Sequence, residues 1–335
     1  MITPRARVQQ AMRHQQPDRV PWQFEFTVPS RRKLQAYYGV EDLTPILDNH
    51  LATYEALPPN AWQEIRPNYW RDEFGVVWNR TIDKDIGIVD SYQLPERSLA
   101  GYRFPDPGDP RRYVGLPAFI AAHADRFRIV NIGFSLFERA WTLRGMLELM
   151  VDMLEAPAWV DELLAAITAY NLGIIEEVVK YDIDAVMFGD DWGQQTGLLM
   201  GGRLWRRFLK PHLAQMYQAV KRAGKLVFIH SCGKVQELFP DLIELGLDCF
   251  NPFQPEVMNP YEIKRQFGQH LAFYGGMSIQ RILPYGTPQE VRDEARRLMD
   301  EVGRGGGYII APSHAMPGDI PVENMVALIE TVHAG

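Results

Sequence analysis

Cysteine is scarce in this sequence, and so are long apolar runs. The two cysteines, Cys232 and Cys249, are too few for a disulfide scaffold, which is typical of a reducing compartment. No apolar run approaches the ~20 residues of a membrane-spanning helix, and the first residues lack the apolar core of a signal peptide. We therefore expect a soluble, cytoplasmic protein with no membrane partner.

Basic side chains are not in excess either. The formal net charge of −7 argues against a general nucleic-acid binder or a protein of the membrane surface. The chain also has no Gly-x-Gly-x-x-Gly after its first predicted strand and no phosphate-cradling Walker loop. These two absences disfavour a doubly wound, nucleotide-binding fold.

Short apolar strands alternate with amphipathic helices from residue 129 onward. This alternation predicts a parallel sheet, and a chain of 335 residues suits an α/β barrel. We expect a single (β/α)8 TIM barrel domain in residues 1–335, with the barrel itself over about residues 15–333 and a helix opening at Thr3-Pro4. The predicted strands of the regular part begin at Ile129, Ala185, Leu226, Leu247, Leu271 and Tyr308.

The first third of the chain is less regular. Residues 20–26 form the first predicted strand, and residues 31–57 are expected to be helical. Residues 58–117 are rich in Pro, Trp and charge, which indicates an insertion that covers one end of the barrel. Within it, residues 71–90 are expected to form hairpins.

Candidate metal ligands follow two of the apolar strands. His230 and Cys232 point to the same side of an extended chain, and His314 follows the last strand in the same way. In a barrel these ends meet at one mouth, where the three side chains would hold one Zn²⁺ and leave its fourth position open, as in catalytic zinc sites. The alternatives are a hydrogen-bonded core histidine with a buried thiol, or Cys249 as third ligand, although its place at the start of a strand puts it well below the mouth.

Further candidates for catalysis are Asp190, Asp191, Gln254 and Glu138. Asp190 and Asp191 are adjacent, so only one of them can point into the barrel. A carboxylate there could orient a ligand histidine or accept a proton, whereas the simpler interpretation is a helix cap or an ion pair with Arg. Glu138 follows the strand at residue 129 and could stand at the same mouth, but an ordinary surface pair with Arg139 is the favoured interpretation.

Several motifs along the chain together resemble one known family. The chain is similar to the uroporphyrinogen decarboxylase superfamily, which includes zinc-dependent, corrinoid-linked methyltransferases, and the resemblance covers nearly the whole length. It implies a (β/α)8 barrel with its active site at the carboxyl ends of the strands. The motifs are Thr3–Arg7, Pro17–Pro21, Gly189–Asp191, His230–Gly233, Phe273–Gly276 and Pro321–Asn324.

The chain departs from the decarboxylases proper. It lacks the Arg-Gln-Ala-Gly-Arg loop that holds a polycarboxylated tetrapyrrole in those enzymes, and the basic residues near its start do not recreate that loop. Porphyrin decarboxylation is therefore the second choice. The residues in question are Arg5, Arg7, Arg13 and Arg19.

The chain also departs from the methyltransferase branch. That branch completes its zinc site with a second cysteine near the last strand, where this chain has Ser313-His314. A neutral imidazole leaves the metal one unit less negative and makes it the stronger Lewis acid. We therefore expect a methyltransferase that moves a methyl group between a small methylated compound and the cobalamin of a partner corrinoid protein. A third reading is a non-catalytic barrel that binds a small molecule or a corrinoid, and the sequence is compatible with a homodimer.

Overall fold

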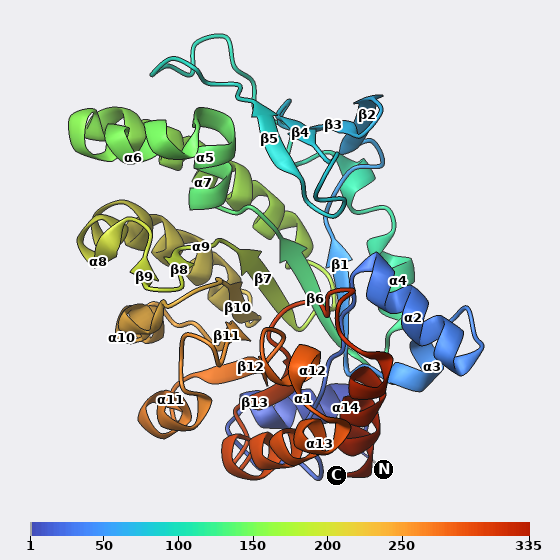
Figure 1. The fold of residues 1–335 in the computed structure, drawn as a ribbon. Helices are drawn as coiled ribbons and strands as arrows, with labels where there is room; N and C mark the ends of the chain where they lie inside the picture. The colour runs from blue at the N-terminus through green and yellow to red at the C-terminus, as the bar shows by residue number, and fades with distance from the viewer. Residues whose placement is uncertain (1) are drawn as a thin grey trace.

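The computed structural model describes residues 2–335 and is built around one curled parallel sheet (Figure 1). Its seven strands follow each other in the order β1-β6-β7-β10-β11-β12-β13, so neighbours in the sheet are neighbours in the chain apart from the inserted small strands. The strands are β1 (Leu51–Glu55), β6 (Phe127–Ile132), β7 (Ala185–Gly189), β10 (Leu226–His230), β11 (Cys249–Phe253), β12 (Ala272–Met277) and β13 (Tyr308–Pro312).

Residues 20–26, the first predicted strand, close the sheet into a barrel. On one side, the N–H of Gln23 donates to the carbonyl of Ile310 in β13 over 3.1 Å. On the other side, the N–H of His50, just before β1, donates to the carbonyl of Trp22 over 3.2 Å. This segment stands in the place of the eighth strand, and the expected (β/α)8 barrel is confirmed.

Helices cover the outside of the barrel and one end of it. Thr287 and Glu290 form the capping box that the sequence predicts for α13. The helices are α1 (Pro4–Met12), α2 (Val28–Tyr38), α3 (Thr44–Leu47), α4 (Leu116–Ala122), α5 (Phe137–Arg144), α6 (Met146–Glu155), α7 (Pro157–Val178), α8 (Gly201–Leu204), α9 (Lys210–Arg222), α10 (Phe239–Glu244), α11 (Pro260–Phe267), α12 (Ile282–Tyr285), α13 (Pro288–Arg297) and α14 (Val322–Ala334).

The apolar residues form two layers. Side chains that alternate along the strands, such as Leu51, Phe228 and Cys249, fill the inside of the barrel, where Val8 and Met12 of α1 pack against them. The intervening residues point outward into a larger layer between strands and helices. The lower barrel is thus a packed core, and the upper part is left for a site.

One prediction for the first third is wrong. Residues 31–57 are not a continuous helix: α2 ends at Gly39, which has a left-handed φ of 67°, and residues 51–55 form β1. β1 pairs in parallel with β6 along all five of its residues. Pairing with a strand more than 70 positions further along the chain determines the conformation of this stretch.

The residues after β1 form a separate antiparallel sheet, as expected for hairpins in residues 71–90. It has the order β2-β3-β4-β5 and lies at the end of the molecule opposite the two termini (Figure 1). Its strands are β2 (Trp62–Arg66), β3 (Tyr69–Asp72), β4 (Val77–Asn79) and β5 (Ile88–Ser91). The strands of the barrel point towards this end, so the small sheet stands over the mouth.

Helix α7 is long and apolar enough to suit a membrane span by length and composition alone. However, 56% of its apolar window is buried within the structure. Its buried residues, Leu163, Leu164 and Ile167 among them, belong to the layer between helices and strands. Packing against the barrel therefore accounts for its composition.

Candidate active site at the mouth of the barrel

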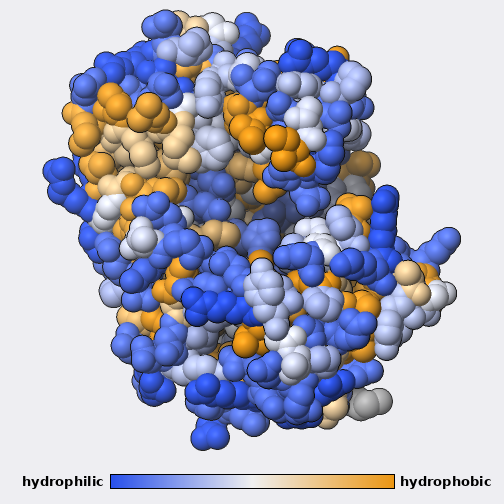
Figure 2. Space-filling model, viewed as in Figure 1, coloured by the Kyte–Doolittle hydropathy of each residue, from blue (hydrophilic) through white to orange (hydrophobic). Residues whose placement is uncertain are grey.

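A cavity of about 460 Å³ opens at the carboxyl ends of the strands. It reaches down to Leu51 and Ile129 inside the barrel, and at its upper end it is lined by polar side chains from all eight strands or strand ends of the barrel. In the space-filling view, a mainly hydrophilic hollow lies between two hydrophobic areas, one of them over α5 and α6 (Figure 2). We call this space the mouth cavity.

His230, the last residue of β10, is held in one orientation. Its Nδ1 lies 2.6 Å from Oδ1 of Asn251, and Nδ2 of Asn251 donates to the carbonyl of Tyr274 over 3.0 Å. Because the amide nitrogen faces a carbonyl, Oδ1 must be the atom that faces His230, so Nδ1 carries the proton. In the neutral form of the ring, Nε2 is then the nitrogen that can bind a metal, as in a metal-ligating histidine with its supporting hydrogen bond.

Cys232 stands on the turn that follows β10. Its Sγ lies 3.3 Å from Nε2 of His230, and its N–H donates to Oδ1 of Asp191 over 2.7 Å. The turn needs Gly233, which has a φ of 86° and packs so closely on β8 (Gly193–Gln194) that a Cβ would lie 2.3 Å from the carbonyl carbon of Gly193. Burial, together with the charges of Asp191 and Glu138, raises the pKa of the Cys232 thiol.

His314 completes the group. Donor atoms of His230, Cys232 and His314 all lie within 4.8 Å of one another, and the two imidazole rings are 5.6 Å apart, edge to face. Burial in the cavity and the neighbouring His230 lower the pKa of His314, which favours its neutral, ligating form. Cys249 lies in the packed layer inside the barrel instead. The structure thus brings the three expected ligands together, and zinc binding stays a prediction.

The mouth cavity is lined by four carboxylates: Glu25, Glu55, Glu138 and Asp191. No lysine or arginine of residues 2–335 lines it. Burial raises the pKa of Glu138 well above its usual value, and the charges of Asp191 and Asp190 raise it further. Burial also raises the pKa of Glu55, although Nδ2 of Asn131 donates to its carboxylate over 2.9 Å. With four carboxylates and no lysine or arginine of the described residues in its lining, the cavity favours the binding of a cation and disfavours that of a polyanion.

Of the two adjacent aspartates, only Asp191 faces the mouth cavity. Asp190 is fully buried behind it, where its carboxylate accepts hydrogen bonds from the N–H of Glu138 over 2.8 Å and from the indole of Trp192 over 2.6 Å. It thus holds the start of α5, which precedes β7 in the chain, and not the start of the helix that follows its own strand. Gln254 also lies outside the cavity lining, and its Oε1 accepts the N–H of Gly233 over 3.2 Å.

Of the neighbouring residues Glu138 and Arg139, only Glu138 lines the mouth cavity. Arg139 turns away from it, and its Nη1 donates to Asp72 of the small sheet over 2.9 Å. Both Arg139 and Asp72 are less than 9% exposed, so the surface pair that the sequence suggested for residues 138 and 139 is wrong.

Sequence reasoning missed several residues of the mouth cavity. Asn251 has a signal in the sequence, because it lies two positions after the inward-facing Cys249. Glu55 was not found because the sequence predicts a helix for residues 31–57, whereas Glu55 ends strand β1. Other polar residues that were missed are Glu25, Thr53, Asn131 and Tyr274.

The arginines near the start of the chain lie far from the mouth. Arg5 pairs with Asp184, next to the first residue of β7, and Arg7 pairs with Asp18. Both pairs belong to the amino end of the barrel, where α1 covers the strands. They supply no positive charge to the active end, in agreement with the missing tetrapyrrole-binding loop.

The fold and the site define a class: a parallel α/β barrel with titratable and metal-ligating side chains at the carboxyl ends of its strands. Comparison with known families is consistent with this class. The model of the family described as "Uroporphyrinogen decarboxylase (URO-D)" matches residues 134–335. The chain belongs to the uroporphyrinogen decarboxylase family.

Curated relatives are distant. A uroporphyrinogen decarboxylase of Methylococcus capsulatus is 25% identical over 248 residues, which cover 68% of this chain and 66% of that protein. One of an Anaeromyxobacter species is 26% identical, with coverage of 69% and 66%. The chain therefore spans just under two thirds of the length of these two relatives.

A solved structure shows the same fold over the whole chain. The methyltransferase from Methanosarcina mazei superposes with a TM-score of 0.75 and covers 100% of this chain and 99% of its own. At 16% sequence identity, the likeness concerns the fold alone. The family and the barrel are thus established, and the reaction has to be argued from the site.

Proposed function

We propose that this protein is a zinc-dependent methyltransferase that moves a methyl group between a small methylated compound and the cobalt of a corrinoid protein. The observation that carries the proposal is the convergence of His230, Cys232 and His314 at the mouth cavity, with donor atoms within 4.8 Å of one another.

The donor set fits zinc. Ligands at ~2.0–2.3 Å from a tetrahedral zinc lie roughly 3.3–3.8 Å from one another. The distance of 3.3 Å between Nε2 of His230 and Sγ of Cys232 meets this requirement, and His314 needs only a small side-chain movement. Two imidazoles and one thiolate suit zinc rather than a hard cation. The raised pKa of the Cys232 thiol agrees with a ligand that ionises when a cation binds, not with a free nucleophile.

Bound zinc would supply a Lewis acid for the heteroatom that carries the methyl group, and a set with a single thiolate keeps this acidity high. The protein would supply the proton. Transfer of the methyl group of an ether to the cobalt(I) of the partner would break the carbon–oxygen bond and leave an alkoxide, which must be protonated. Glu138 is the candidate donor, because burial raises the pKa of its carboxyl and so favours the protonated form that can donate.

Decarboxylation of a tetrapyrrole is the alternative, favoured by the description of the matching family model and by the names of the distant relatives. Uroporphyrinogen carries many carboxylates, whereas four carboxylates and no lysine or arginine of the described chain line the mouth cavity. The carboxylates of the substrate and those of the cavity would repel each other in a partly desolvated site.

The test combines the zinc-loaded protein with reduced cobalamin and a panel of methoxy-aromatic compounds, methylamines and methyl thiols. We expect methylcobalamin to form, as followed by absorbance, and we expect this activity to be lost in Cys232→Ser but kept in Cys249→Ser. Decarboxylation of uroporphyrinogen by the same preparation, without any methylation of cobalamin, would overturn the proposal. Binding of panel compounds or cobalamin without either reaction would favour the non-catalytic barrel.

A further inference from the structure

A second cavity of about 250 Å³ lies beside the mouth cavity, between the barrel and the small sheet. We call it the side chamber. Four residues, Glu55, Asn131, Gly133 and Phe134, line both spaces, so the two are contiguous. Neither the family nor the proposed zinc site accounts for this chamber.

The lining of the side chamber is largely apolar. Ala61, Phe74, Ile132 and Ile174 contribute to it, and Trp62 closes one side. An apolar cavity of ~150 Å³ in another protein stays dry and binds benzene. A chamber of this larger volume therefore has room for one substituted aromatic ring.

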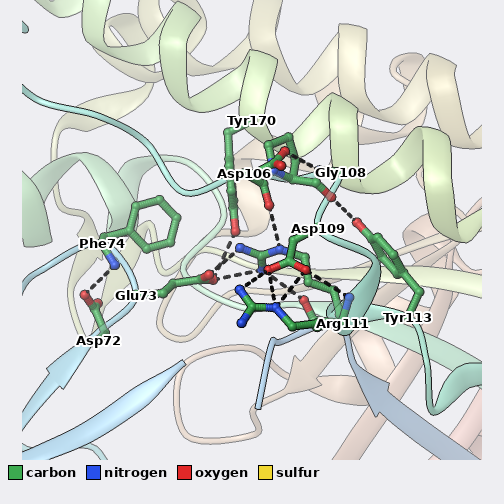
Figure 3. Close-up of polar contacts among 12 residues, drawn as sticks. Asp72, Glu73, Phe74, Asp106, Gly108, Asp109, Arg111, Tyr113 and Tyr170 are labelled. Atoms are coloured by element: carbon green, nitrogen blue, oxygen red, sulfur yellow. Dashed lines mark hydrogen bonds and ion pairs between the residues drawn. The ribbon is translucent and has the colours of Figure 1, made fainter. Parts of the chain in front are cut away.

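Most of the polar groups in the wall are already satisfied. Asp72 accepts four hydrogen bonds, from the N–H groups of Phe74 and Val76, the indole of Trp78 and the guanidinium of Arg139. Glu73 accepts a hydrogen bond from Tyr170 over 3.0 Å, as Figure 3 shows. It is also bound by the guanidinium of Arg112. The protein itself therefore satisfies the hydrogen-bonding capacity of these two carboxylates, without a bound ligand.

Arg139 is the exception. Its guanidinium stacks on Phe74, 3.8 Å from the ring centre, and Nη1 is bound to Asp72. Its Nε is buried without a partner in the described part of the chain, while the whole residue is 7% exposed. A buried N–H without an acceptor is unfavourable, so this donor calls for an acceptor atom on something that enters the chamber.

We propose that the side chamber binds the aromatic ring of the substrate and that Nε of Arg139 donates to an oxygen on that ring. The substrate class is then an oxygen-substituted arene such as an aryl methyl ether. The reaction at such a compound rests on the proposed function, whereas the binding of the ring does not.

The boundary between the two cavities is well fixed. Phe134 has a φ of 48°, a strained conformation for a residue with a Cβ, and its ring packs against Trp78 at 5.2 Å. Asn131 is bound to Glu55 across the same boundary. A substituent on a ring in the side chamber can therefore reach the mouth cavity across this boundary.

Calorimetric binding of anisole and ethylbenzene, without zinc or cobalamin, tests this inference. The two ligands have nearly the same shape, but only anisole carries an oxygen. We expect the wild type to bind both and to prefer anisole by about tenfold. Ala61→Phe fills the chamber and should weaken both ligands at least tenfold, whereas Ala100→Phe adds the same ring at an exposed position and should leave binding unchanged. Arg139→Leu should remove the preference for anisole.

Circular dichroism and thermal unfolding of each variant establish that it is folded. If Arg139→Leu does not fold, Ala61→Phe still decides the location of the ring, and the anisole preference of the wild type decides the need for an oxygen. Failure of the wild type to bind either ligand, or equal binding by Ala61→Phe, overturns the inference. Methylation of cobalamin by methylamine alone would then leave the proposed function standing. Binding of anisole in the chamber without any methyl transfer would support the inference about the ring and contradict the proposed function.

Discussion

Asp190 is the residue whose role changes most between sequence and structure. It is one of two adjacent carboxylates at a strand end, yet it lies behind the mouth cavity and accepts N–H groups from α5 and from Trp192. Burial raises its pKa to about 6, and these hydrogen bonds offset only part of that effect. Asp190 therefore determines where Glu138 stands, because the two are joined through the backbone N–H of Glu138.

The raised pKa of Asp190 predicts a pH-dependent contribution to stability. Between its usual value of 3.8 and about 6, the folded state keeps the proton that the unfolded state has lost. This group therefore makes the protein less stable as the pH rises through that window, by up to about 3 kcal/mol in free energy of unfolding. Asp190→Asn should remove this slope. Urea unfolding of both proteins at several pH values between 4 and 7 measures the difference.

Two features complicate that comparison. Asn at this position turns one donor towards the indole of Trp192, so near pH 4 the variant should be less stable than the wild type by about 1–3 kcal/mol, and this difference should shrink as the pH rises. The informative quantity is the change of this difference with pH. A constant difference from pH 4 to 7 would mean that Asp190 ionises normally.

At the level of single residues, the sequence predicts the three candidate ligands but not Asn251, which orients His230. His230, Cys232 and His314 could be predicted because each ends or follows an apolar strand. Asn251 was missed in favour of Gln254, three positions later, because the register between β11 and β12 shifts between Phe250 and Phe253. Alternation before the shift selects Asn251, and no local pattern reveals the shift itself.

Two neighbouring arginines show how the small sheet is attached to the barrel. Arg112 is 1% exposed and binds Glu73, while Arg111 stays at the surface with Asp109 (Figure 3). Removing one partner of a buried ion pair leaves the other charge without compensation. Arg112→Ala should therefore lower the free energy of unfolding by about 3–5 kcal/mol.

Arg111→Ala is the matched control, because it removes the same side chain one position earlier. Its ion pair is exposed to solvent, so we expect no measurable change in urea unfolding. Equal effects of the two substitutions would contradict the view that Glu73 and Arg112 join the inserted sheet to the rest.

Elements with a local signal were predicted, and those fixed by distant pairing were not. The capping box of α13 is complete within four residues, and the structure contains it. Residues 51–55, Leu-Ala-Thr-Tyr-Glu, carry no clear strand pattern and become β1 only through their pairing with β6. The helix predicted there failed because tertiary contacts outweighed a weak local preference.

For the whole molecule, the barrel explains why residues far apart in the chain meet. His230 and His314 are 84 positions apart, and β11 and β12 lie between their strands in the sheet. A metal that binds both would connect β10 to the segment after β13 across the mouth. Such a link exists only in the folded state, so metal binding should stabilise the whole barrel.

We therefore expect zinc to raise the thermal unfolding midpoint. At a free zinc concentration of 100 times the dissociation constant, the gain is about 2.7 kcal/mol, a shift of a few degrees for a chain of this size. Chelation should reverse the shift, and Cys232→Ser and His314→Ala should abolish most of it. Cys249→Ser tests the other thiol: it places a hydroxyl in the packed barrel interior and lowers stability, but the shift caused by zinc should remain. If zinc stabilises Cys232→Ser as much as the wild type while Cys249→Ser no longer responds, the thiolate ligand is Cys249 and the site lies deeper in the barrel than the three donors at the mouth.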